Sequence, residues 1–400
     1  MSLSHRKVKK ELIIRDAQGN PLANRQVSIE QKSHSFLFGC GAFEFMNHIK
    51  DPNEQTADIT SKWLKIFNYG TLPFYWGRYE PEEGKPDEEN LMKTAKYLQE
   101  RGVRVKGHPL CWHTVCADWL MKYDNKTILQ KQLDRIHREV TNFKGVIDMC
   151  DVINEVVIMP VFDKYDNAVT RICNDRGRIA LVKDVFEAAH ESNPDATLLI
   201  NDFNLSEAYR ILIDGLINAG VPIGAIGIQT HQHQGYMGRE KVLDILKRYE
   251  VFGIPIHFTE NTLISGDIMP SYIVDLNDWQ VDEWPTTPEG EERQCREIEE
   301  MYRILFDHPL VEAITTWDFR DGAWLKAPAG FLRLDNTEKP SYRMLEKLVN
   351  EEWSTKLSLQ TDSEGRVTVE GFKGGYCVSA DGMKAELSMT DDSEMTVKLS

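Results

Sequence analysis

Short apolar runs alternate with amphipathic stretches through the middle of the chain. The apolar runs have the length and β-branched content of strands, whereas the amphipathic stretches repeat their apolar positions with the period of a helix. Eight such rounds can be counted, and this rhythm predicts a parallel α/β fold that closes as a (β/α)8 TIM barrel. The predicted strands are Phe36–Phe43, Ile66–Leu72, Val103–Leu110, Met149–Asn154, Thr197–Asn201, Ile223–Gln229, Ile254–Glu260 and Ala313–Asp318. The predicted helices include Glu88–Glu100, Thr127–Phe143, Arg178–Ser192, Ser206–Ala219, Lys241–Phe252 and Glu289–Phe306.

Both ends of the chain have a different pattern. Glu11–Glu30 contains two alternating runs around a polar turn, and Lys356–Ser400 repeats this pattern with several further turns. Alternation with period two between turn residues is typical of short antiparallel strands. We therefore expect an N-terminal β segment over residues 1–34, the barrel over 35–353 and a small C-terminal β domain over 354–400, with the two β elements outside the barrel and serving structural packing.

The bulk composition limits the classes of binding partner that can be expected for the chain. With 400 residues and 41% hydrophobic content the chain can bury one barrel, which typically needs about 250 residues. A formal net charge of −16 disfavours nucleic acid and anionic membranes, because both would repel the chain, whereas a neutral sugar polymer meets no such repulsion. No apolar run approaches the roughly 20 residues needed to cross a bilayer. The composition leaves the oligomeric state open.

The seven cysteines are odd in number and scattered, unlike the framework of a disulfide-rich secreted protein. This pattern mildly favours a reducing compartment. The first ten residues are basic and no apolar stretch follows them, so no intact secretory signal is expected. The expectation is therefore either a cytoplasmic protein or a secreted one whose signal peptide has been removed.

Polar side chains stand at the ends of five of the predicted strands. In a (β/α)8 barrel the C-terminal strand ends face the active site, so a run of polar endings indicates a catalytic mouth rather than core. The endings are Lys106-Gly-His108, Asn154-Glu155, Asn201-Asp202, Gln229-Thr-His231 and Thr259-Glu260.

Two of these endings supply glutamates, on the fourth and the seventh strand. Cleaving a glycosidic bond with retention needs two carboxyl groups about 5–5.5 Å apart, one protonated and one ionised. Asn154 lies beside Glu155 and suits a sugar hydroxyl, so we expect Glu155 to carry the proton with a raised pKa. Glu260 ends a hydrophobic strand and is expected to be the nucleophile, with His231 donating to it.

At these residues the sequence resembles glycoside hydrolase family 10, the retaining β-1,4-xylanases, over roughly residues 36–350. The motifs that carry the resemblance are Lys106-Gly-His-Pro-Leu-Cys-Trp-His113, Asp151-Val-Ile-Asn-Glu155, Asn201-Asp-Phe-Asn204, Gly227-Ile-Gln-Thr-His231, His257-Phe-Thr-Glu260 and Trp317 with Lys339-Pro-Ser-Tyr342. The resemblance implies that Glu155 is the acid/base, Glu260 the nucleophile and Asn154 the binder of a sugar 2-hydroxyl. It also implies that the subsite next to the cut is lined by His108, Trp112, Gln229, His231, Trp317 and Trp324.

By the same resemblance the chain is an endo-1,4-β-xylanase-like hydrolase. Its substrate would be a β-linked polysaccharide or oligosaccharide such as xylan or xylo-oligosaccharides. The chemistry would need no cofactor and no metal.

The chain departs from the family pattern on its second strand. Members of the family usually carry Glu-Asn-x-x-Lys before a Trp, and these polar groups hold the second sugar; here Thr71-Leu-Pro-Phe-Tyr75 precedes Trp76. Losing matched donors and acceptors normally costs strong discrimination. Either Tyr75, Trp76 and Arg78 replace those contacts, or the second sugar differs from xylose.

Further departures lie nearer the expected nucleophile. Val115 stands where the family has Gln, and Thr262 where it has an acidic residue, so His231 is expected to lack a carboxylate partner. The segment Ser265–Pro288 is long for a barrel connection, and long loops on the catalytic face usually shape substrate access. The candidates for replacement contacts are Asp278, Trp279, Trp284 and Arg320.

Two other kinds of protein remain as alternatives. A metal-dependent hydrolase would use His231 and His233 together with His108 or His113, although zinc usually needs a further ligand nearby. A non-catalytic sugar-binding barrel would explain the missing second-strand residues, but it has no use for two converging carboxyl groups. A retaining β-glycosidase of the same family with a different sugar specificity is also open.

Overall fold

The structure is a computed structural model that describes residues 3–400 of the chain. It contains two compact units, one over Phe38–Ser341 and the other formed by the N-terminal part up to Leu37 together with Tyr342–Ser400. Residues 1–2 of the expected N-terminal β segment lie outside the described residues.

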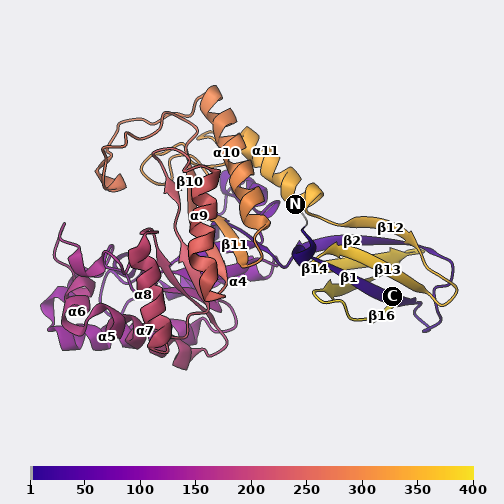
Figure 1. Cartoon of the computed structure of the whole chain (residues 1–400), viewed down its shortest axis with the longest axis horizontal. Helices are drawn as coiled ribbons and strands as arrows, with labels where there is room; N and C mark the ends of the chain where they lie inside the picture. Colours follow the sequence, from indigo (N-terminus) through magenta and orange to yellow (C-terminus); the bar gives the residue numbers. More distant parts are fainter. Residues whose placement is uncertain (1–2) are drawn as a thin grey trace. The chain divides into compact units, whose positions relative to one another are not determined.

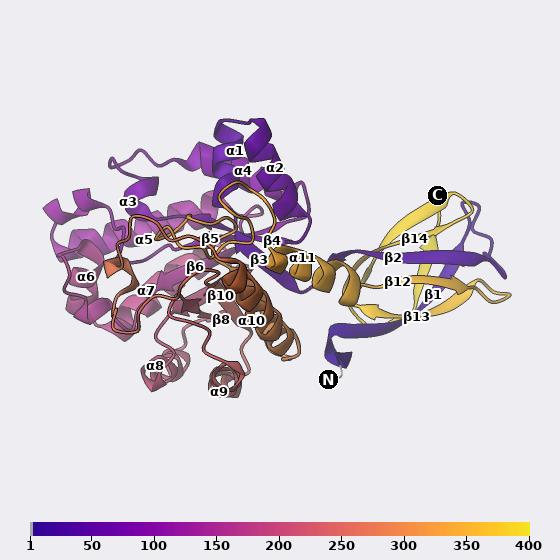
Figure 2. The same cartoon turned by 90° about the horizontal axis from the view of Figure 1, so that it is seen from above.

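The larger unit is a closed parallel barrel (Figures 1 and 2). Each strand pairs with the next along the chain, and the ring closes because the last strand, β11, pairs with both β10 and β3. The predicted (β/α)8 TIM barrel is therefore confirmed. Its strands are β3 (Leu37–Gly41), β4 (Tyr69–Pro73), β5 (Arg104–His108), β6 (Met149–Asn154), β7 (Thr197–Asp202), β8 (Ala225–Ile228), β10 (Ile256–Leu263) and β11 (Val311–Thr316), and the two-residue β9 (His231–Gln232) adds beside β10.

Helices fill the connections between the barrel strands and surround them, as Figure 2 shows. The α-helices are α1 (Phe43–Lys50), α2 (Glu54–Leu64), α3 (Trp76–Tyr79), α4 (Glu88–Gln99), α5 (Asn125–Asn142), α6 (Ala168–Arg176), α7 (Arg178–Ser192), α8 (Glu207–Asn218), α9 (Arg239–Tyr249), α10 (Pro288–Phe306) and α11 (Pro340–Lys347). Shorter helical turns are η1 (Ser4–Arg6), η2 (Asp118–Lys122), η3 (Met159–Val161), η4 (Glu250–Phe252), η5 (Leu276–Asp278) and η6 (Leu348–Glu352).

Local sequence explains where several helices begin. Asp124 caps α5 by accepting a hydrogen bond from Thr127 N–H, so this helix starts two residues before the predicted Thr127. Thr287 caps α10 in the same way, and Pro288 occupies its first position, where a missing N–H costs nothing. Helix α7 matches its predicted bounds, Arg178–Ser192.

The barrel strands that carry the expected carboxyl groups are buried along their whole length. Every residue of β6 and β10 is buried, including the polar ones near the C-terminal end. Strand β10 extends three residues beyond the predicted end at Glu260, because Thr262 and Leu263 pair with β9. A buried polar group needs a hydrogen-bonding partner, so these strand ends define a network rather than a loose surface.

The smaller unit contains two sheets around one apolar core. Their strand orders are β13-β1-β16 and β12-β2-β14-β15, with one parallel pair, β1–β16, among antiparallel ones. The strands are β1 (Lys7–Arg15), β2 (Gln26–His34), β12 (Lys356–Gln360), β13 (Arg366–Phe372), β14 (Gly374–Ala380), β15 (Met383–Met389) and β16 (Met395–Lys398). The flanking β elements expected from both ends are thus present.

The grouping of these strands differs from the expected division into segments 1–34, 35–353 and 354–400. Strands β1 and β2 take all their neighbours from the C-terminal strands, so both ends of the chain form a single unit. Their alternating apolar residues share one core, which includes Leu12, Val27, Val369 and Val378. Neither end has enough apolar surface to form a core alone, which explains the shared sheets.

No helix within residues 3–400 is long and apolar enough to cross a membrane.

Candidate active site

Of the two expected catalytic carboxyl groups, one lies just after β6 and the other in the C-terminal half of β10. Glu155 directly follows β6, and its backbone has a φ of 56°, a left-handed conformation that is unfavourable for a residue with a side chain. Its N–H donates to the carbonyl of Asn201 at 2.8 Å, which holds this conformation. Glu260 lies within β10 and is 4% exposed.

Three side-chain amides connect these carboxyl groups. The Nδ2 of Asn201 donates to Glu260 Oε1 at 2.7 Å and to Asn154 Oδ1 at 2.8 Å. The Nε2 of Gln229 donates to the same Asn154 oxygen at 3.0 Å and to Glu155 Oε1 at 3.4 Å. A continuous path of hydrogen bonds therefore runs from Glu155 through three amides to Glu260, and it brings together residues from β6, β7, β10 and the end of β8.

Glu260 is also held by a histidine. His231 Nε2 lies 2.9 Å from Glu260 Oε2, and His231 Nδ1 lies 2.6 Å from Thr262 Oγ1. The family's acidic partner of this histidine is absent, as expected, and a buried hydroxyl occupies its place. With the Nε2 proton directed at Glu260, a neutral imidazole accepts from the Thr262 hydroxyl, which fixes its tautomer and ring orientation.

A charged pair lies deeper in the barrel. Lys106 Nζ and His108 Nδ1 both approach Asp151 Oδ2, at 2.6 and 2.7 Å, and all three side chains are buried. His108 Nδ1 is also 3.9 Å from Glu260 Oε1. Burial would raise the pKa of Asp151, but Lys106 and His108 outweigh it, so the pKa of Asp151 lies below its usual value.

The environments of the two glutamates shift their pKa values in opposite directions. Burial, reinforced by the charges of Glu260 and Asp202, raises the pKa of Glu155 to about 8 although the Trp112 N–H opposes it. Burial acts in the same direction on Glu260, but His108 and His231 outweigh it and lower its pKa. At neutral pH the site therefore holds one protonated and one ionised carboxyl group.

Aromatic rings surround this pair. Trp112 Nε1 donates to Glu155 Oε2 at 2.8 Å. Trp317 packs with its ring centroid 5.2 Å from that of His108 and 5.9 Å from that of His231, and Trp324 lies 4.7 Å from His231. These contacts place the rings of Trp112, Trp317 and Trp324 beside Glu155, His108 and His231.

Only one of the two expected second-strand aromatics lies there. The Tyr75 ring is 5.6 Å from His108 and 5.7 Å from Trp112. The ring of Trp76 instead packs against Trp119 and under Arg135, and its N–H goes to Glu80, so we do not place it at the sugar site. Tyr75 is the N-cap of α3 and Trp76 its first residue, so their side chains leave the backbone in different directions.

The rest of the second-strand ending faces inward. Thr71, Leu72 and Phe74 are all buried, and the hydroxyl of Thr71 has no hydrogen-bond partner within residues 3–400. Tyr75 therefore supplies this strand's contribution to the aromatic wall.

The residues proposed as replacement contacts lie elsewhere. Trp279 and Trp284 pack against each other, with ring centroids 6.0 Å apart, in a small apolar cluster of the segment after β10. Asp278 pairs with Lys164 at 2.9 Å, and Arg320 Nη2 donates to the carbonyl of Leu334. None of these contacts reaches Glu155 or Glu260, although Trp284 packs near His233.

The histidines considered for a metal site do not converge. Both nitrogens of His231 are taken by Glu260 and Thr262. His113 packs on Phe162, and burial lowers its pKa to about 4. Burial and the neighbouring His231 lower the pKa of His233 to about 3. Among the described residues 3–400 no three His, Cys, Asp or Glu side chains are arranged to hold a metal ion.

Sequence reasoning gave no role to Asn201 or to the Thr262 hydroxyl. The signal for Asn201 was its place at the end of the fifth strand, where it pairs in register with Asn154. Thr262 follows Glu260 by two residues, so both side chains point to the same face of β10, which strand periodicity alone predicts.

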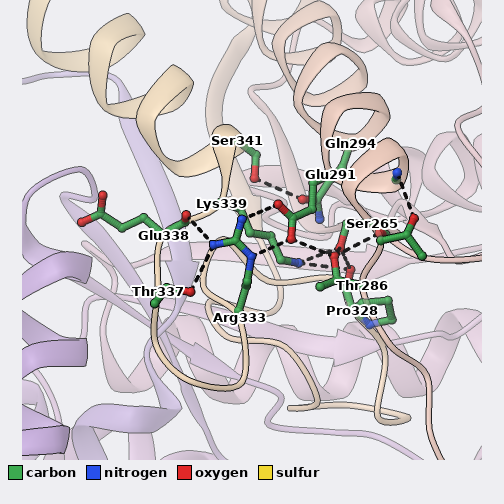
Figure 3. A network of polar contacts seen from close by, with 12 residues as sticks. Ser265, Thr286, Glu291, Gln294, Pro328, Arg333, Thr337, Glu338, Lys339 and Ser341 are labelled. Atoms are coloured by element: carbon green, nitrogen blue, oxygen red, sulfur yellow. Dashed lines mark hydrogen bonds and ion pairs between the residues drawn. The ribbon is translucent and has the colours of Figure 1, made fainter.

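A second polar network fixes the loops beside the site (Figure 3). The fully buried Lys339 donates to Asp321 Oδ1 at 2.6 Å and to Ser265 Oγ at 2.7 Å. Asp321 lies three residues before Trp324, and Ser265 lies five residues after Glu260. Lys339, in the motif shared with the family, thus ties the Trp324 loop to the segment after β10.

The closed barrel and its two glutamates, joined by amides, fit the barrel glycoside hydrolase class. The model of the glycosyl hydrolase family 10 matches residues 49–347. The chain belongs to this family.

The sequence identities to two individual relatives are low. An endo-1,4-beta-xylanase/feruloyl esterase of Xylanibacter ruminicola is 29% identical over 265 residues, covering 58% of this chain and 35% of that protein. The anti-sigma-I factor RsgI6 of Acetivibrio thermocellus is 25% identical over 381 residues, covering 94% of this chain and 45% of that protein. The chain thus spans between a third and a half of the length of these relatives.

A solved structure supports the fold. The chain is similar to a family 10 structure from Paenibacillus barcinonensis with a TM-score of 0.64 and 23% identity, over 79% of this chain and 95% of that one. At this identity the likeness concerns the architecture.

Removing the hydroxyl of Thr262 tests its hold on His231. Thr262→Val keeps the size of the side chain but leaves His231 Nδ1 without its partner. Since one neutral hydrogen bond contributes about 1 kcal/mol, we expect kcat/KM on an aryl β-xyloside to fall about fivefold to tenfold. Thr262→Ser should restore most of the rate, and equal rates for the Val variant and the parent chain would show that His231 is held by other contacts.

Replacing the buried cation tests the loop network. Lys339→Met leaves Asp321 buried without its partner, so the free energy of unfolding should fall by about 3–5 kcal/mol in urea titrations. The double variant Asp321→Asn with Lys339→Met should recover part of this loss, because the unpaired charge is gone. Lys183→Ala, which removes only an exposed pair with Glu187, serves as control and should change stability by at most about 0.5 kcal/mol. Equal losses in the single and double variants would contradict the role of the charge.

Proposed function

We propose that the chain is a retaining glycoside hydrolase that cleaves β-1,4-xylosidic bonds in xylan or xylo-oligosaccharides by double displacement. Glu155 is the acid/base and Glu260 the nucleophile. The observation that carries this proposal is the pair of carboxyl groups joined by amides, with opposite pKa shifts. Two carboxyl groups of equal character would not divide the acid and nucleophile roles.

In the first step Glu155 gives its proton to the glycosidic oxygen while Glu260 attacks the anomeric carbon. The bond to the leaving sugar breaks and an ester forms between the sugar and Glu260. In the second step Glu155, now ionised, removes a proton from water, whose oxygen attacks the same carbon and releases Glu260. The configuration at that carbon is inverted twice and therefore retained.

The surrounding side chains support these roles. Asn201 and His231 donate to the two oxygens of Glu260, which keeps the nucleophile ionised and oriented before substrate binds. The Asn154 oxygen accepts from Asn201 and Gln229, which leaves its NH2 group to donate to a sugar 2-hydroxyl. Such a bond strengthens in the transition state.

The sugar is assigned from the relatives and the aromatic wall. A relative named endo-1,4-beta-xylanase/feruloyl esterase shares 29% identity over 265 residues. Trp317 and Trp324 offer apolar faces to a sugar ring next to Glu260. Because the second strand offers Tyr75 where the family has a polar triad, a retaining β-glycosidase for a different sugar is the alternative within the family.

A sugar-binding barrel without turnover is the second alternative, and the buried Thr71 and Leu72 favour it. Against it stands the raised pKa of Glu155, because a binding site gains nothing from a buried proton donor facing a second carboxyl group. Turnover of an aryl β-xyloside or of a xylo-oligosaccharide excludes this alternative.

Removing either carboxyl group tests the assigned roles. We expect Glu155→Ala and Glu260→Ala each to lower kcat by several orders of magnitude, because each removes a group that forms or breaks bonds to the reacting atoms. With an aryl β-xyloside, azide should rescue Glu260→Ala by forming the α-glycosyl azide and Glu155→Ala by forming the β-anomer, which NMR distinguishes. An active Glu260→Ala enzyme without azide would overturn the assignment.

The pH profile tests the two pKa shifts. Activity needs Glu155 protonated and Glu260 ionised, so it should stay high from weakly acidic pH up to about 8, the raised pKa of Glu155. Above it kcat/KM should fall tenfold per pH unit as Glu155 loses its proton, and the acid limb should lie below the usual range of glutamate because the pKa of Glu260 is lowered. Glu155→Gln should abolish the alkaline limb. An alkaline limb centred near the ordinary pKa of glutamate would contradict the assignment of Glu155.

A further inference from the structure

The segment Ser265–Thr287, here called the strap, connects β10 to α10 and is folded rather than loose. Met269 and Trp284 are buried in an apolar cluster with Ile264 and Ala327, and Trp284 Nε1 donates to the carbonyl of Asp267 at 2.7 Å. Long barrel loops with their own packed core are usually functional.

The first part of the strap is held by the loop between β9 and α9. Met269 N–H donates to the carbonyl of His233 at 2.8 Å. The side chain of Gln234 donates to the carbonyls of Pro270 and Ile273, at 2.9 and 2.7 Å. The strap therefore follows the rim of the barrel away from β10, in the direction of β8.

The tip of the strap, residues 273–280, is held by the loop that follows β6. Lys164 Nζ lies 2.6 Å from Asp275 Oδ2 and 2.9 Å from Asp278 Oδ1. Asp275 is the N-cap of η5 and also accepts from Asn277, so its carboxylate is held in place for Lys164. In Figure 2 the strap, in orange-brown, extends from β10 toward α6.

The order of the strands around the barrel shows on which side of the two carboxyl groups the strap lies. Glu155 follows β6 and Glu260 lies in β10, and between these strands stand β7 and β8 on one side and β11, β3, β4 and β5 on the other. A sugar chain cut between the two carboxyl groups crosses the line that joins them. One of its ends must therefore leave over β7 and β8, which is the side that the strap spans from β10 to Lys164.

We propose that the strap, clasped by Lys164, closes the substrate groove over β7 and β8, so that the enzyme acts on short xylo-oligosaccharides or chain ends in preference to the interior of long polymers. This proposal rests on the proposed function and specifies its substrate length. A groove covered on one side accepts few sugars beyond the cut there, whereas an open groove accepts a long chain on both sides.

The strength of the ion pairs between Lys164 and the two aspartates sets the size of the effect expected when Lys164 is removed. Lys164 is 41% exposed, and such partly exposed ion pairs contribute at most about 1 kcal/mol, or about fivefold in an equilibrium. Removing Lys164 alone should open the strap part of the time, whereas shortening its tip should open it permanently.

The first experiment uses the unmodified chain. We expect kcat/KM to reach its highest value at a short member of the series from xylobiose to xylohexaose, and to be at least about tenfold lower on soluble xylan per accessible bond. Xylan viscosity should fall slowly relative to the release of reducing ends. A rapid fall in viscosity, or a kcat/KM that keeps rising to xylohexaose and xylan, would overturn the proposal.

The second experiment opens the strap. Lys164→Ala should raise kcat/KM on xylan about threefold to fivefold, and replacing Ile273–Gln280 by two glycines should raise it by about tenfold, with hydrolysis of an aryl β-xyloside unchanged. Lys183→Ala, a matched loss of a surface lysine paired with Glu187, should leave both activities unchanged. If Lys164→Ala and the shortened strap both retain the parent ratio of xylan to oligosaccharide activity, the strap does not control substrate length.

The outcomes separate this inference from the proposed function. Absence of turnover on every β-xyloside by the parent chain refutes the retaining xylosidase assignment. Turnover with an endo product pattern refutes only the proposal that the strap limits substrate length, because the chemistry at Glu155 and Glu260 is then intact.

Discussion

Two acidic groups facing each other in a buried site repel, and the barrel mouth is organised around this constraint. The neutral amides of Asn201 and Gln229 stand between Glu155 and Glu260, each donating to one carboxyl group and to the same oxygen of Asn154. Removing any of these donors would leave a buried acceptor unsatisfied, which costs more than the bond itself. The amides come from β6, β7 and the end of β8, which are consecutive neighbours in the sheet next to β10, so the curvature of this part of the barrel is coupled to the chemistry.

The two carboxyl groups differ because histidine side chains lie against only one of them. His108 and His231 both lie against Glu260, and His108 is in turn anchored by the buried Asp151. Glu155 receives only the Trp112 N–H and a long bond from Gln229, so burial and the neighbouring negative charge dominate its pKa. The same low dielectric thus favours a protonated carboxyl group at Glu155 and an ionised one at Glu260.

The barrel, and the position of Glu155 and Glu260 on its strands, could be predicted from sequence because both depend on local pattern. Strand runs and polar strand endings recur along the chain, and strands four and seven converge in any closed barrel. Trp76 could not be placed, because its direction depends on the short helix α3 and on packing with Trp119. The shared β unit was also out of reach, since β1 pairs with β13 across some 350 residues and alternation does not identify a partner strand.

The strap is bound more firmly at its stem, next to β10, than at its tip. This difference determines which part of the strap can move. At the stem, Ser265 bonds to the buried Lys339 and to the carbonyl of Pro328, in a network that also carries the Trp324 loop. At the tip, Lys164 makes its contacts partly in water, and Leu276 and Trp279 pack against the apolar cluster while only partly buried. Local opening follows the segments with the fewest buried contacts, so the tip can separate while the stem stays fixed. Under the proposed role of the strap, substrate access and the geometry of Glu260 are separable, although a single strand, β10, leads to both.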